Sequence, residues 1–268
     1  MSTAHASGAQ RAFGEHLRQW RQRRRWSQLE LSAQAEISTR HLSFVETGRS
    51  LPSREVVLRL SERLDIPLRE RNAMLMAAGY APMYRERALD DPALAAARTA
   101  IDLVLAGHEP HPALAIDRHW NMVAHNRVVP KLLIDIDVAL LKPPINVLRL
   151  SLHPQGLAPR LANLGQWRAH LFERLRQQIA ATGDAGLVAL RNELLALPVP
   201  PGGEDLQLAG EHTGVVVPLR LKTSAGAMSF ICTTTIFGSP VDVTLQELAV
   251  ETLFAADQAT SDLLRALR

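Results

Sequence analysis

The chain has 268 residues, of which 47% are hydrophobic and 4% aromatic, and this length allows two ordinary domains. No stretch approaches the ~18 continuous apolar residues of a membrane span, and the N-terminus lacks the apolar core of a secretory signal. The single cysteine excludes an internal disulfide framework and predicts a cytoplasmic protein.

The charge is unevenly divided along the chain. Residues 1–89 contain 15 arginines and 9 acidic residues, a net charge of +6, whereas residues 90–268 have a net charge of −3. A basic module joined to a mildly acidic one favours a polyanion-binding head on a separate body. A solvated arginine-rich surface would produce the same charge pattern, so charge alone does not decide between them.

Five short helices are predicted in the first 80 residues, after a small, polar segment over 1–10 that we expect to be disordered. Apolar residues at helical spacing predict the first helix over 11–24. The next four begin at a capping serine or an early proline, namely Ser27, Ser38, Ser53 and Pro67. Gly48 and Gly79 predict the ends of the third and fifth helices. Residues 11–80 therefore read as a compact all-α domain.

A proline-containing, charged stretch over 81–91 is predicted to be a linker, and residues 92–268 form a second domain of mixed structure. Helices are predicted over 92–106, 159–181, 187–197 and 257–267. Alternating apolar runs predict antiparallel strands over 113–117, 121–124, 145–152, 215–222, 228–237 and 248–254. Residues 197–203, LPVPPGG, are predicted to be a loop.

The third helix has the composition of a helix that reads the DNA major groove. Such a helix needs short or hydrogen-bonding side chains near its N-terminus, where Thr39 and Arg40 stand. Arg40 is suited to grip the O6 and N7 atoms of guanine. Ser43 and Phe44 lie one turn further along, and Phe44 is suited to meet a thymine methyl group. Alternatively, Phe44 is half-buried against a neighbouring helix.

Other residues of this domain are assigned to the DNA backbone or to the fold. Gln28, at the start of the second helix, is placed to bind a phosphate together with the amides there, although a first-turn glutamine is also commonly just solvated. The arginines that end the first helix would add salt-sensitive affinity. Glu46 is expected to hold the domain together and not to touch DNA.

The pattern S-Q-x-x-L-S-x-x-A-x-I-S-x-x-x-L-S-x-V-E-x-G-R over 27–49 resembles the Cro and phage-repressor type of helix-turn-helix, the XRE-like regulators. The resemblance implies a five-helix lambda-repressor-like domain. Glu36 departs from the glycine that many members have in the turn, and we expect it to adopt a left-handed conformation. The DNA-contacting residues that the resemblance and the helix positions imply are Gln28, Ser38, Thr39, Arg40, Ser43, Phe44 and Arg49.

The longer stretch RHLSFVETGRSLPSREVVLRLSERLDIPLRERNAMLMAAGYAP, with LDDPAL and HPALAIDRHWNMVAHN, resembles bacterial regulators that carry an MmyB-like ligand-binding domain. The resemblance implies that residues 92–268 form an α+β, PAS-like domain with an antiparallel sheet that binds a ligand and dimerises. It also implies a small, largely apolar ligand, fatty-acid-like in character. The helices and strands predicted above are compatible with this fold.

A ligand pocket is expected between the sheet and the long helix. The apolar candidates for its wall are Trp167, Phe172, Leu219, Met228, Phe230 and Ile236, although each is individually as consistent with plain core. Arg149, His153 and Arg220 are considered as polar anchors for a ligand head group.

No catalytic or metal site is predicted. The chain lacks a G-x-S-x-G elbow, a Walker loop and a dinucleotide fingerprint. Cys232, in the middle of a predicted strand, is expected to be an inert core thiol, with a redox sensor as the alternative. The histidines at 108, 111, 119 and 125 are irregularly spaced in loops, and we expect no metal and no cofactor apart from a bound apolar ligand.

These patterns together predict a bacterial transcription regulator that binds a double-stranded, palindromic operator as a homodimer. Its C-terminal domain is expected to sense the apolar ligand. Two alternatives are weighed: a small-molecule-binding enzyme with an appended helix-turn-helix, and an antitoxin-like adaptor. The first needs a convergent catalytic set, and the second a shorter partner-binding tail.

Overall fold

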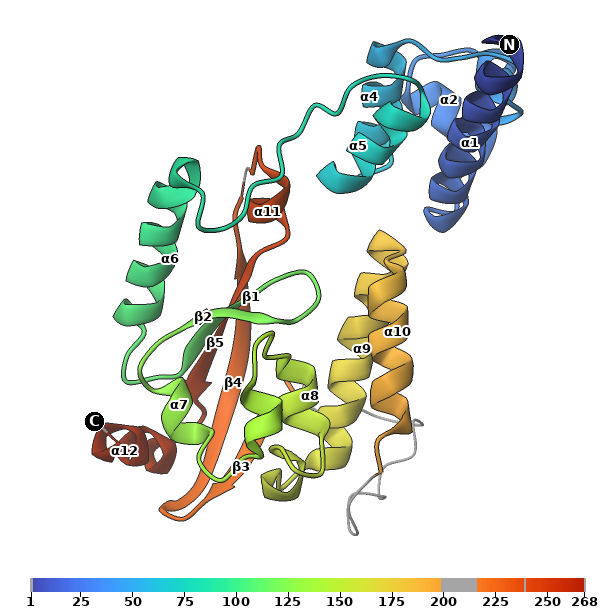
Figure 1. Cartoon of the computed structure of the whole chain (residues 1–268). Helices are drawn as coiled ribbons and strands as arrows, with labels where there is room; N and C mark the ends of the chain where they lie inside the picture. The colour runs from blue at the N-terminus through green and yellow to red at the C-terminus, as the bar shows by residue number, and fades with distance from the viewer. Residues whose placement is uncertain (1, 199–215, 239, 268) are drawn as a thin grey trace. The chain divides into compact units, whose positions relative to one another are not determined.

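The computed structural model describes residues 2–198, 216–238 and 240–267, which divide into two compact units. The first unit consists of residues 2–87 with the short segments 180–182 and 240–246, and the second contains the remaining described residues. Each unit has its own hydrophobic core. Figure 1 shows the elements of both units in chain order.

The first unit is helical, as the sequence predicts. Its elements are α1 (Ser2–Arg23), α2 (Gln28–Gln34), α3 (Thr39–Glu46), α4 (Arg54–Arg63), α5 (Leu68–Ala77) and the short α11 (Val243–Gln246). Their inward faces close one core whose fully buried members include Phe13, Leu17, Leu31, Leu42 and Val57. The five-helix expectation for this part of the chain is confirmed.

Serine caps set the starts of three of these helices. The capping box at α2 is complete, because the Ser27 side chain accepts from the Glu30 amide and the Glu30 carboxylate accepts from the Ser27 amide. The hydroxyls of Ser38 and Ser53 accept backbone N–H groups at the starts of α3 and α4. These bonds satisfy amides that a helix start otherwise leaves unpaired.

The start of α5 is satisfied differently. Pro67 makes no side-chain cap, and the Leu68 amide instead donates to Oε1 of Gln246 at 2.7 Å. The segment of Gln246 is held by Asp242, which is buried and accepts from Nη1 of Arg87 at 2.7 Å. A distant stretch of sequence therefore caps α5, the fifth helix of the first unit.

Two features of the turns agree with the sequence reading, and one segment differs from it. Glu36 has φ +54° in the turn between α2 and α3, and Gly48 has φ +70° after α3. Residues 2–10, expected to be disordered, instead extend α1 back to Ser2. The alanine-rich and proline-free composition of this segment favours helix once the rest of α1 is anchored.

The second unit is built on a five-stranded antiparallel sheet in the order β2-β1-β5-β4-β3. The strands are β1 (Ala113–Ile116), β2 (Met122–His125), β3 (Leu219–Thr223), β4 (Gly226–Ile236) and β5 (Ala249–Ala255). Because β5 is central, it pairs with both β1 and β4. The α+β, PAS-like fold class that the sequence predicts is confirmed.

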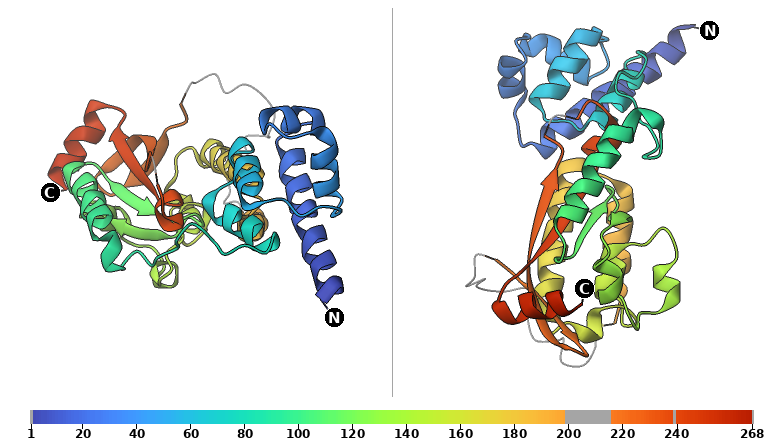
Figure 2. Two further views of the ribbon diagram at one scale, coloured as in Figure 1. Left: turned by 90° about the horizontal axis from the view of Figure 1, so that it is seen from above. Right: turned by 90° about the vertical axis from the view of Figure 1, so that its left-hand side faces the viewer.

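Helices and short 3₁₀ turns surround this sheet. They are η1 (Pro92–Leu94), α6 (Ala95–Gly107), α7 (Val129–Leu132), η2 (Val138–Leu141), α8 (Val147–Leu152), η3 (Ala158–Arg160), α9 (Leu164–Thr182), α10 (Ala185–Ala196) and α12 (Gln258–Ala266). Helices α8, α9 and α10 lie on one side of the sheet and α6 lies on the other (Figures 1 and 2). The larger core fills the space between the sheet and α9.

Two elements of this unit differ from the sequence prediction. Residues 145–152, expected as a strand, contain helix α8, because the Asn146 side chain accepts the amides of Leu148 and Arg149 and starts a helix. The long helix starts at Leu164 and not near 159, where η3 takes its place. Parts of the predicted loop 197–203 and strand 215–222 lie outside the described residues. No helix in the described part of the chain is long and apolar enough to cross a membrane.

Candidate DNA-contacting surface and ligand cavity

Helix α3 separates a buried face from an accessible one. Leu42 and Val45 are fully buried, whereas Thr39 and Arg40 at the helix start are exposed. Ser43 and Phe44, one turn further along, are partly exposed. The accessible face therefore carries the side chains that the sequence assigns to base contacts. Ser38 precedes them, and its hydroxyl oxygen accepts from the His41 amide.

Two cationic side chains lie close to the Phe44 ring. The guanidinium carbon of Arg40 is 5.3 Å from the centre of the Phe44 ring, and that of Arg49 is 5.9 Å from it. Cation–π attraction at these distances holds both side chains beside the ring. The result is a surface with one apolar ring and two positive charges close to it, which suits a polyanion with apolar groups on its edge.

Behind this surface lies a nearly buried ion pair. Glu46 accepts from Nε of Arg21 at 2.6 Å and from Nη2 at 2.9 Å, and the side chains of Arg21 and Glu46 are only 11% and 2% exposed. The hydrogen bond to Glu46, opposed by burial, raises the pKa of Arg21 above its ordinary value. The prediction that Glu46 supports the domain is confirmed.

The same carboxylate holds Gln28. Nε2 of Gln28 donates to Oε2 of Glu46 at 2.8 Å, which fixes the side chain at the first turn of α2. The packing behind it is close, since a Cβ added at Gly14 would lie 2.5 Å from the Glu46 carbonyl oxygen. Helix α3 is also tied to α2 by a 3.0 Å hydrogen bond between the hydroxyls of Ser32 and Thr39. Hydrogen bonds to Glu46 and between α2 and α3 therefore fix the positions of Gln28 and α3, and Arg40 and Arg49 lie next to Phe44 of the same helix.

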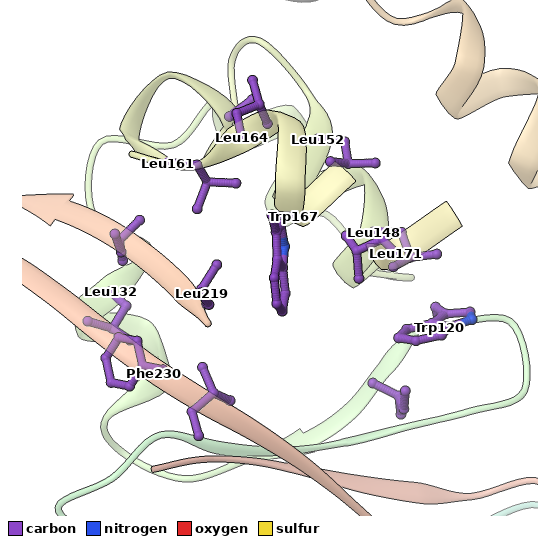
Figure 3. Packing of buried hydrophobic residues seen from close by; sticks show 14 of the residues in the cluster. Trp120, Leu132, Leu148, Leu152, Leu161, Leu164, Trp167, Leu171, Leu219 and Phe230 are labelled. Atoms are coloured by element: carbon purple, nitrogen blue, oxygen red, sulfur yellow. The ribbon is translucent and has the colours of Figure 1, made fainter. Parts of the chain in front are cut away.

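The second unit contains an apolar cavity of about 120 Å³. This is many times the ~15 Å³ that one water molecule needs. All five strands and the helices α7, α8 and α9 contribute to its wall. The apolar residues that line it include Leu114, Trp120, Met122, Val129, Leu132, Leu148, Leu150, Trp167, Leu171, Leu219, Leu221 and Leu253. Figure 3 shows Trp167 projecting between Leu219 on one side and Leu148 on the other.

The six predicted pocket residues lie in three different environments. Trp167 and Leu219 line the cavity. Met228 and Phe230 are buried in the adjoining core, where Phe172 also packs, partly buried beneath the guanidinium of Arg168. The prediction is wrong for Ile236, which is 68% exposed because β4 is uncovered over residues 233–236.

The three predicted polar anchors do not reach the cavity wall. Arg149 pairs with Glu193 at 2.6 Å, Nδ1 of His153 accepts from the Gln155 amide, and Arg220 is exposed. The described charged residues that do line the cavity are Arg174 and Glu251. Sequence reasoning missed both of them.

Arg174 and Glu251 satisfy one another. Nη2 of Arg174 donates to Oε1 of Glu251 at 2.7 Å and Nη1 donates to Oε2 at 3.3 Å. The Thr234 hydroxyl donates to the same Oε1 at 2.9 Å. The Arg174 guanidinium carbon also lies 4.6 Å from the centre of the Trp120 ring. The Glu251 and Arg174 side chains are 9% and 26% exposed, so the pair is largely removed from water.

Further residues with polar groups line the cavity, among them Ser151, Cys232 and Trp167. Burial, with a smaller contribution from Glu251, raises the pKa of the Cys232 thiol to about 12, so the thiol stays protonated. The indole N–H of Trp167 is buried and has no hydrogen-bond partner among the described residues. An unpaired buried donor is costly, and an acceptor on a ligand would relieve that cost.

His108 and His119 contact neighbouring side chains in the described part of the chain. His108 packs edge-on against Phe254 with ring centres 4.7 Å apart, and burial together with His111 lowers its pKa. His119 instead pairs with Asp184 at 2.9 Å. Among the described residues, no group of three or more histidine, cysteine, aspartate or glutamate side chains is arranged to hold a metal ion.

Comparison with known protein families gives two matches. Residues 12–74 match a helix-turn-helix domain, and residues 97–267 match the ligand-binding domain of MmyB-like transcription regulators. The first match lies within the first unit, and the second contains most of the cavity-bearing unit. No curated protein matches the chain.

Proposed function

The chain belongs to the MmyB-like transcription regulators, which join a helix-turn-helix to a ligand-binding domain, and we propose its function on that basis. It is therefore a DNA-binding, ligand-sensing transcription regulator. The finer proposal is that it binds a specific duplex sequence and that a small, fatty-acid-like ligand in the apolar cavity alters that binding. We place this activity in the cytoplasm.

The observation that carries the DNA part of the proposal is the accessible face of α3 beside Gln28. Arg40 contacts the O6 and N7 atoms of a guanine, and the Phe44 ring lies against a neighbouring thymine methyl group. Gln28, oriented by Glu46, contacts a phosphate, and Arg49 contacts the backbone. Thr39 and Ser43 complete the base-facing set, with Ser38 at the start of the helix.

The proposed binding unit is a homodimer on a palindromic operator. One recognition helix covers only a few base pairs, so two copies related by a two-fold axis would read half-sites ~34 Å apart. The ligand would then act by changing the equilibrium between arrangements of the two copies. Such coupling has a typical size of ~1–3 kcal/mol.

The ligand part of the proposal rests on the composition of the cavity. Aliphatic and aromatic side chains form almost all of its wall, as is usual for sites that bind apolar molecules. The high pKa of Cys232 makes this thiol a poor nucleophile. The match over residues 97–267 speaks against a short adaptor tail.

Two experiments test this proposal on the full chain. Fluorescence anisotropy should show tight binding to a duplex from the region upstream of its own gene, weaker binding to a shuffled duplex, and a steep loss of affinity with salt. Equal affinity for both duplexes would contradict sequence-specific binding. Native mass spectrometry of the purified protein should show a co-purified apolar molecule, and a preparation that neither carries nor takes up such molecules would contradict the ligand role.

A further inference from the structure

The charge balance of the cavity wall bears on the chemistry of the ligand. Among the described residues that line the cavity, Arg174 carries the positive charge and Glu251 the negative charge. Their side chains are joined by two hydrogen bonds, at 2.7 Å and 3.3 Å. The wall therefore has no net charge left to neutralise an ionised ligand.

The Glu251 carboxylate already accepts three hydrogen bonds. Oε1 accepts from both Arg174 and the Thr234 hydroxyl, and Oε2 accepts from the other terminal nitrogen of Arg174. A ligand carboxylate near this pair would have to share Arg174 with a carboxylate that already holds it. It would also lose water at a site where an uncompensated charge is costly.

Two other polar residues of the wall, Cys232 and Trp167, favour a neutral acceptor, and Ser151 is also uncharged. The Cys232 thiol keeps its proton, since burial raises its pKa to about 12, and adds no positive charge. Trp167 lines the cavity, and its buried N–H lacks a partner among the described residues, so a ligand acceptor that reached it would need no charge. An ester, ketone or lactone oxygen meets this condition at a lower desolvation cost than a carboxylate.

We propose that the cavity selects an apolar molecule with an uncharged, hydrogen-bond-accepting head group, and that the Arg174–Glu251 pair excludes the ionised carboxylate of a free fatty acid. This inference rests on the proposed ligand-sensing function and specifies its ligand class. The ligand resembles a fatty acid in its chain and differs from it in its head. Arg174 and Glu251 are then specificity-determining residues of the cavity.

The test compares two probes that share one chain, decanoic acid and methyl decanoate. Isothermal titration calorimetry on the full-length, delipidated protein at about pH 8, where the acid is ionised, should give at least ~10-fold tighter binding of the ester, a difference of ~1.4 kcal/mol. Equal or tighter binding of the acid overturns the proposed selectivity but leaves an apolar ligand site intact. Binding of neither probe overturns the ligand-sensing proposal itself.

A charge change in the pair should reverse the preference. Glu251→Gln leaves Arg174 without its partner, so the decanoate anion should now bind ~10-fold more tightly than the ester. The double variant R174Q/E251Q restores neutrality and should restore the preference for the ester. An unchanged preference in E251Q overturns the proposed role of the pair.

The matched control is Glu173→Gln. Glu173 pairs with Arg176 on the same helix, α9, but both side chains are at least half exposed and neither lines the cavity. E173Q removes the same charge as E251Q and should keep the wild-type preference. If E173Q also came to prefer the decanoate anion, the effect would come from the net charge of the region and not from the cavity pair, and the proposal would be overturned. The wild-type comparison needs no variant, so the proposal stays falsifiable if E251Q does not fold.

Discussion

The two units of this protein each bury an arginine–glutamate pair, and they use it differently. In the first unit Arg21 and Glu46 lie behind the DNA-contacting surface, and Glu46 also holds Gln28. In the second unit Arg174 and Glu251 line an apolar cavity. Burying such a pair costs about as much as the attraction returns. The net contribution of an intact pair to stability is therefore small. The first pair matters because it positions Gln28, and the second because it excludes a charged ligand.

The largest expected effect comes from removing half of the pair in the first unit. Glu46→Ala leaves Arg21 buried without its partner, which should lower the free energy of unfolding by ~3 kcal/mol and weaken DNA binding. Urea unfolding of the full chain, followed by circular dichroism, measures the first effect. The matched control is Glu55→Ala, because Glu55 pairs with Arg59 at an exposed site and should cost at most ~0.5 kcal/mol. Equal costs in the two variants would break the contrast between buried and exposed pairs.

Arg40→Ala should have the next largest effect, on specificity. Loss of the contact to guanine should remove ~1–3 kcal/mol of discrimination between operator and shuffled duplex, with little change in stability because Arg40 is exposed. Anisotropy titrations of both duplexes measure the difference. A variant that discriminates as well as the wild type would remove Arg40 from the base-reading set.

Gln28→Ala should have a smaller and sequence-independent effect. Losing one phosphate contact should weaken binding to every duplex alike, by ~1 kcal/mol. The ratio of affinities for operator and shuffled duplex should stay at the wild-type value. A changed preference between the two duplexes would contradict the phosphate role. An unchanged affinity for both would show that Gln28 does not contact the DNA.

Removing the partly exposed pair Arg149–Glu193 should have the smallest effect of the variants considered. The hydrogen bond from Arg149 lowers the pKa of Glu193. Its stabilising contribution is therefore present above the ordinary pKa of glutamate and is lost as the pH falls through the lowered folded value. The difference in unfolding free energy between wild type and Glu193→Gln should be under ~1 kcal/mol at neutral pH and vanish in acid. A difference that grows in acid would contradict the sign.

Much of the first unit was readable because its signals are local. The caps at Ser27, Ser38 and Ser53, and the left-handed Glu36, each depend on a few neighbouring residues. The structural role of Glu46 was foreseen, whereas its partner Arg21 was not, since that pairing crosses 25 positions of sequence. The cap that Gln246 provides for α5 has no local signal at all.

The cavity was less readable because it assembles distant segments. In β5 the apolar residues Val250 and Phe254 suggest one inward face, but the strand is central and the cavity face carries Glu251 and Leu253. Alternation cannot choose between the two faces of a strand covered on both sides. Similarly, 145–152 alternates like a strand, and only the cap from Asn146 makes it a helix.

The proposed function requires that occupation of the cavity changes DNA binding. Its most direct test is the affinity of one delipidated preparation for its upstream duplex, measured before and after reloading with the molecule that native mass spectrometry identifies. With the cavity shown to be filled, the affinity should change by ~5–150-fold, in either direction. The same affinity in the empty and filled states would contradict the account.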